Sequence, residues 1–134
     1  LATLDRAPAI AAPGGVQVPT PELSFIADNM AKGVSATPAI TVHASATWSE
    51  ERWDEDVDAL RDALIGLVAP WLGEAAVTEA HVKKWRFATP RTPWPEPCWV
   101  AHGGTIVLAG DAFDGPRVEA AHNSGLAAAH ALVG

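Results

Sequence analysis

The apolar residues between positions 38 and 72 change their period, and this change most constrains the fold. Residues 38–48, PAITVHASATW, alternate apolar and polar side chains, a period of two that is typical of a half-buried antiparallel strand. From Ser49 onward the apolar residues recur at steps of three and four, which predicts an amphipathic helix over about residues 50–72. Ser49, followed by two glutamates, is a suitable helix start, and Gly73 is a suitable end.

The rest of the chain predicts further strands and one more helix. One strand is expected at residues 1–5, and two more between residues 14 and 29. A further strand is expected over residues 75–90, with its inward-facing positions at Val77, Ala80, Val82 and Trp85.

Beyond position 90 the expected elements are a loop, a hairpin and a helix. The proline-rich residues 91–98 form the loop, and two strands follow around a tight turn at His102-Gly103-Gly104. The last helix is expected to begin with Pro116, since proline favours the first helical position. Together these elements predict an α+β fold with an antiparallel or mixed sheet.

Charge, apolar runs and cysteine content exclude several classes of partner. The formal net charge is −7, and the only basic cluster is Lys83-Lys84-Trp85-Arg86, so nucleic acid and anionic membranes are not expected partners. No apolar run approaches the roughly 20 residues that span a bilayer. The single cysteine, Cys98, indicates a reducing compartment and therefore a cytoplasmic location.

The C-terminal helix is built almost wholly from small residues. Its expected inner face contains Val118, Ala121, Gly125, Ala128 and Leu132, which have little bulk to bury. One interpretation is a helix that packs tightly on a sheet. The other is a ligand at the helix start, where free backbone N–H groups and the helix dipole suit an anion or a carbonyl.

Gly110 and Asp111, just before this helix, fit the second interpretation. Gly110 has no Cβ, so a ligand can approach the backbone closely, and the Asp111 carboxylate can accept hydrogen bonds from hydroxyl groups. A metal site is not expected, because the histidines lack partners at ligand spacing.

Residues 106–132, IVLAGDAFDGPRVEAAHNSGLAAAHAL, resemble the C-terminal signature of FAD-dependent amine oxidases. The segments LSFIADNMAKG, ITVHASATWSEERW and VKKWRFATP are similar to the renalase-like branch of that group. The resemblance implies a two-domain flavoenzyme, with residues 1–97 in the substrate domain and 98–134 in the FAD-binding domain. Such enzymes begin with a strand–GxGxxG–helix unit that this sequence lacks, so we expect a C-terminal portion of a longer protein that binds FAD weakly by itself.

Carried onto this sequence, the resemblance implies roles for five residues in cofactor binding. Gly110 and Asp111 would meet the pyrophosphate and ribityl region of FAD. The N–H of Val118, at the helix start, would face the pyrimidine edge of the flavin, where negative charge develops on reduction. Arg117, next to it, is a further cofactor-binding residue. Ala121 would leave room for the cofactor.

The implied reaction passes a hydride from an amine or a dihydronicotinamide-like small molecule to the flavin and then to oxygen. Trp85 and His43 are candidate substrate-binding residues, although a core tryptophan and a surface histidine are equally simple interpretations. Apolar surfaces that would meet the missing half predict self-association. The alternative is a non-enzymatic α+β module that binds a partner through its tryptophan-rich surface.

Overall fold

The computed structural model describes residues 1–18 and 20–133. The chain divides into two compact units, Leu1–Lys84 and Trp85–Gly134, which we call unit 1 and unit 2. The division based on the sequence was placed at residues 97 and 98. In the structure, the segment from Trp85 to residue 97 groups instead with the C-terminal part of the chain.

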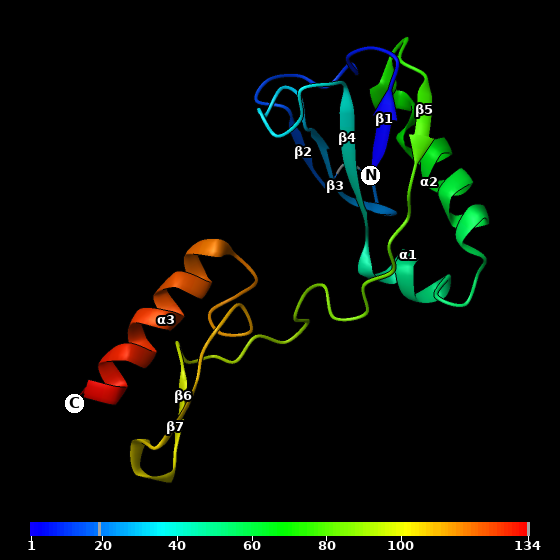
Figure 1. The fold of residues 1–134 in the computed structure, drawn as a ribbon. Helices are drawn as coiled ribbons and strands as arrows, with labels where there is room; N and C mark the ends of the chain where they lie inside the picture. Colours follow the sequence, from blue (N-terminus) through cyan, green and yellow to red (C-terminus); the bar gives the residue numbers. More distant parts are fainter. Residues whose placement is uncertain (19, 134) are drawn as a thin grey trace. The chain divides into compact units, whose positions relative to one another are not determined.

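Unit 1 contains a five-stranded sheet in which every pair of neighbours is antiparallel (Figure 1). The sheet order is β2-β3-β4-β1-β5, so the first strand of the chain lies between β4 and β5. The sheet and the helices beside it confirm the predicted α+β class. The strands are β1 (Ala2–Leu4), β2 (Gly15–Gln17), β3 (Leu23–Asp28), β4 (Ala39–Ala44) and β5 (Val77–Ala80).

Two helices, α1 (Ala46–Glu51) and α2 (Val57–Leu72), replace the single helix expected from Ser49. The predicted start was wrong because two other side chains cap the helices. The Ser45 hydroxyl accepts a hydrogen bond from the Trp48 N–H at 3.2 Å and begins α1. The Asp56 carboxylate begins α2.

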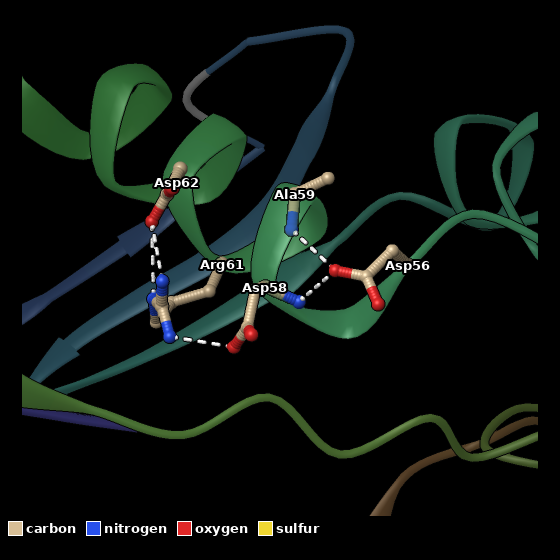
Figure 2. Close-up of polar contacts among 5 residues, drawn as sticks. All are labelled: Asp56, Asp58, Ala59, Arg61 and Asp62. Carbon is tan, nitrogen blue, oxygen red and sulfur yellow. Dashed lines mark hydrogen bonds and ion pairs between the residues drawn. The ribbon is translucent and has the colours of Figure 1, made fainter.

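The cap of α2 is drawn in Figure 2. One carboxylate oxygen of Asp56 accepts hydrogen bonds from the backbone N–H groups of Asp58 and Ala59, at 2.9 and 3.2 Å. The helix ends as expected: Pro70 lies in its last turn, and Gly73 follows with a φ of +64°.

The core of unit 1 lies between one face of the sheet and α2. Pairing of Ile26 with Val42, and of Ala2 with Ile40, sets these side chains on the face that packs against Val68. Ile26 and Ile40 are completely buried. The cluster of buried residues is Ala2, Leu4, Leu23, Ile26, Ile40, Val68, Leu72 and Ala75.

The strand predicted over residues 75–90 is shorter than expected. Only β5 is a strand, and its pairing with β1 ends where the His81 N–H donates to the carbonyl oxygen of Leu1 at 2.9 Å. Beyond this point the backbone is irregular, and Trp85, expected to face inward, is 68% exposed.

Unit 2 consists of a β-hairpin and a long helix. Strands β6 (Trp99–Ala101) and β7 (Ile106–Leu108) pair antiparallel around the tight turn at residues 102–104, as predicted. Helix α3 (Val118–Val133) contacts both strands. It begins two residues later than expected, because its first intrahelical hydrogen bond joins the Ala121 N–H to the carbonyl oxygen of Arg117, at 3.0 Å.

Candidate functional site

A hydrogen bond between the end of the hairpin and the middle of α3 organises the candidate site. The backbone N–H of Gly110 donates to the hydroxyl oxygen of Ser124 at 2.9 Å, and Ser124 is fully buried. Gly110 has a φ of +145°, a backbone conformation that side chains with a Cβ rarely adopt. The chain therefore leaves β7 in a glycine-dependent conformation that is tied directly to the helix.

Backbone hydrogen bonds order the loop that follows. The Trp94 N–H donates to the carbonyl oxygen of Ala112 at 2.7 Å, and the Asp114 N–H donates back to the carbonyl oxygen of Trp94 at 3.3 Å. Phe113, between them, is 9% exposed. These hydrogen bonds connect the proline-rich loop to the loop before α3, and they order the chain just before the helix begins.

An open hollow of about 420 Å³ lies at the N-terminus of α3. Its volume falls within the range of about 300–1,000 Å³ that is usual for small-molecule sites. Four of its lining residues, Asp111, Arg117, Val118 and Ala121, had been singled out from the sequence as cofactor-binding. Pro116 completes the lining and was not among those candidates.

Gly110 does not line the hollow, but it directly precedes Asp111, and its positive φ determines the direction of the backbone at that point.

The hollow combines groups that suit an elongated ligand bearing phosphates and hydroxyls. The guanidinium of Arg117 and the free N–H groups of the first helical turn favour negative charge. The carboxylate of Asp111 can accept hydrogen bonds from hydroxyl groups. Within residues 1–18 and 20–133, the guanidinium has a single hydrogen bond, a long one of 3.5 Å to the carbonyl oxygen of Asp114. These groups could hold a ligand that carries both phosphate and hydroxyl groups.

The packed face of α3 differs from the predicted one. Ala120 and Ser124 are the buried residues of the helix, whereas Val118 and Leu132 are 90% and 61% exposed and Gly125 is also exposed. The predicted face was displaced by about one residue, a rotation of about 100° around the helix axis. Because small residues occur on nearly every side of α3, their spacing alone does not select the inner face.

The two candidate substrate-binding residues are not part of the hollow's lining. Trp85 belongs to unit 2 and is mostly exposed. His43 is an exposed residue of β4 in unit 1, where its ring centroid lies 5.5 Å from that of Phe25, its cross-strand partner. Neither residue is among those that surround the hollow.

The role of Ser124 was not predicted from the sequence. No sequence signal indicates this role, because the burial of Ser124 depends on the rotation of α3, and a buried hydroxyl then needs a partner.

Other kinds of site find no support in the described part of the chain. Among residues 1–18 and 20–133, no group of three or more His, Cys, Asp or Glu side chains could hold a metal ion. The same residues include no helix with the length and apolar character needed to cross a membrane. Comparison with models of known protein families and with curated proteins gives no significant match.

Proposed function

We propose that this chain is the C-terminal portion of an FAD-dependent oxidoreductase of the amine oxidase type, similar to its renalase-like branch. In this proposal unit 2 supplies the last FAD-binding segment, and the sheet of unit 1 belongs to the substrate domain. The substrate is an amine or a dihydronicotinamide-like small molecule, and oxygen is the final acceptor.

One observation carries the proposal: four residues that the resemblance assigns to FAD surround a single hollow at the start of α3. The residues come from the loop between β7 and α3 and from the first turn of the helix, a stretch that lies within the strand–Gly-Asp–helix unit that carries the resemblance. The donor set also fits the group, since Arg117 and the helix N–H groups suit phosphate or a charged ring edge, and Asp111 suits hydroxyls.

Bound flavin would supply the hydride-accepting chemistry, and the protein would supply position and electrostatics. The N–H of Val118 is proposed to stabilise negative charge at the ring edge, because a helix N-terminus favours an anion there. Trp85 and His43 remain proposals for the substrate side, as aromatic wall and hydrogen-bonding group.

The test uses the polypeptide encoded by the complete gene. Purified protein should carry flavin absorbance or bind added FAD, seen as quenching of flavin fluorescence. Asp111→Ala and Arg117→Ala should each weaken FAD binding about tenfold, because each removes a polar contact or a charge. The matched control is Asn123→Ala, an exposed position on the same helix. Absence of FAD binding, or a reading frame without a strand–GxGxxG–helix unit upstream, would contradict the proposal.

Exposed aromatic residues of unit 2 favour a second candidate, a partner-binding module without enzymatic activity. Trp85 and Phe87 are 68% and 87% exposed, and Trp94 is 47% exposed. Large exposed apolar groups commonly mark association surfaces, which also include self-association. Fluorescence titration of the complete polypeptide with FAD distinguishes this candidate: a stable, folded protein that does not respond to FAD would support it, and FAD binding would contradict it.

A further inference from the structure

Ser124 occupies a position where this helix would otherwise be expected to carry alanine. It is fully buried in α3, and the residues one turn away on either side, Ala120 and Ala128, are alanines. A buried hydroxyl destabilises a fold unless it is hydrogen-bonded, and alanine has the higher helix propensity. The hydroxyl therefore has a specific use, and the structure records its partner: the backbone N–H of Gly110.

This hydrogen bond joins the two segments that supply lining residues of the hollow. Gly110 is followed directly by Asp111, a lining residue. Ser124 lies on the same helix as Val118 and Ala121, which also line the hollow. The distance between the carboxylate and the helix start consequently depends on the bond between Gly110 and Ser124.

We infer that Ser124 is a positioning residue for the cofactor site: through Gly110 it holds the Asp111 carboxylate at the distance from the helix N-terminus that FAD binding requires. The inference rests on the proposed function. Ser124 itself is fully buried and is not one of the residues that line the hollow, so its proposed effect on the ligand is indirect.

The test measures FAD affinity of the complete polypeptide by flavin fluorescence. Ser124→Ala should weaken binding about tenfold, the effect of losing one well-placed hydrogen bond. Ser124→Cys retains the side-chain size with a weaker acceptor and should give an intermediate affinity. Asn123→Ala should bind as tightly as the unaltered protein. Thermal unfolding monitors the fold of every variant.

A double-mutant cycle with Asp111→Ala separates positioning from general support of the fold. If Ser124 acts through Asp111, the Ser124→Ala substitution should have little further effect once the carboxylate is gone. Additive losses, or an affinity unchanged by Ser124→Ala, would overturn the positioning role and leave the proposed function standing. Failure of the unaltered protein to bind FAD would overturn both.

Discussion

The ammonium group of Lys84 donates a hydrogen bond of 2.6 Å to the backbone carbonyl oxygen of Trp53. The same group donates a second bond, of 2.7 Å, to the carbonyl oxygen of Glu55. Both carbonyls belong to the loop between α1 and α2, and Lys84 is the last residue of unit 1. One side chain thus fastens the end of unit 1 to the loop that connects its two helices.

Replacement of Lys84 by methionine should destabilise unit 1. Methionine keeps the length and apolar body of the side chain but cannot donate to the two carbonyls, so the free energy of unfolding should fall by about 1–2 kcal/mol. Urea denaturation followed by tryptophan fluorescence measures the change. Repeating the denaturation at high salt separates the two contributions, because salt screens charge; a loss that disappears at high salt would show that charge alone matters.

The cap of α2 gives a second prediction. Asp56→Ala should lower stability by about 1 kcal/mol, because two backbone N–H groups at the start of the helix lose their acceptor. Asp54→Ala is the control, because Asp54 is an exposed acidic residue of the same loop and lies outside the cap. Thermal unfolding of the two variants should therefore differ, and equal melting temperatures would contradict the capping role.

Gly66, within α2, and Gly73, which follows its last residue, should respond in opposite directions to substitution by alanine. Gly66 lies within the helix with open space around it, so Gly66→Ala should stabilise the unit by about 0.5–1 kcal/mol. Gly73 has a φ of +64°, and a Cβ there would lie 2.9 Å from the Cβ of Ala9. Gly73→Ala should consequently destabilise by more than about 1 kcal/mol. Chemical denaturation gives both signs, and a shared sign would contradict the argument.

The carboxylate of Asp5 should make stability depend on pH. Its pKa is lowered from the ordinary 3.8, first by the hydrogen bond from the Ala76 N–H and then by its bond with the Arg6 guanidinium. A carboxylate with a lowered pKa stabilises the fold above its unfolded pKa and loses that effect as the pH falls through the folded value. Asp5→Asn should therefore reduce the urea midpoint at neutral pH, with the difference shrinking as the pH falls below 3.8. A difference independent of pH would contradict this assignment.

Local patterns predicted the elements of unit 1 better than their connections. The alternation in residues 38–48 located β4, because a half-buried strand imposes a period of two on its own sequence. The break between α1 and α2 was missed, since Ser49 with its following glutamates is as plausible a cap as Asp56 when each is viewed alone. Which of these residues caps a helix depends on whether its side chain reaches free backbone N–H groups in the folded chain. The position of β1 between β4 and β5 likewise depends on pairing across the length of the unit.

The candidate hollow was easier to anticipate than the face of its helix. Asp111 and Ala121 are only ten residues apart, so a strand–loop–helix pattern suffices to bring them near one another. The bond between Gly110 and Ser124 requires a particular rotation of α3, and a helix rich in small residues does not encode that rotation in its spacing. The exposure of Trp85 could not be predicted either, because an alternating pattern does not indicate at which residue the strand pairing stops.

The pairing of β1 with β5 brings the entry and exit of unit 1 together. The amino group of Leu1 donates to the carbonyl oxygen of His81 at 3.0 Å, and the His81 N–H donates back to Leu1 at 2.9 Å. A module with adjoining ends suits insertion into a surface turn of a host protein, or circular permutation, because neither rearrangement requires its sheet to open.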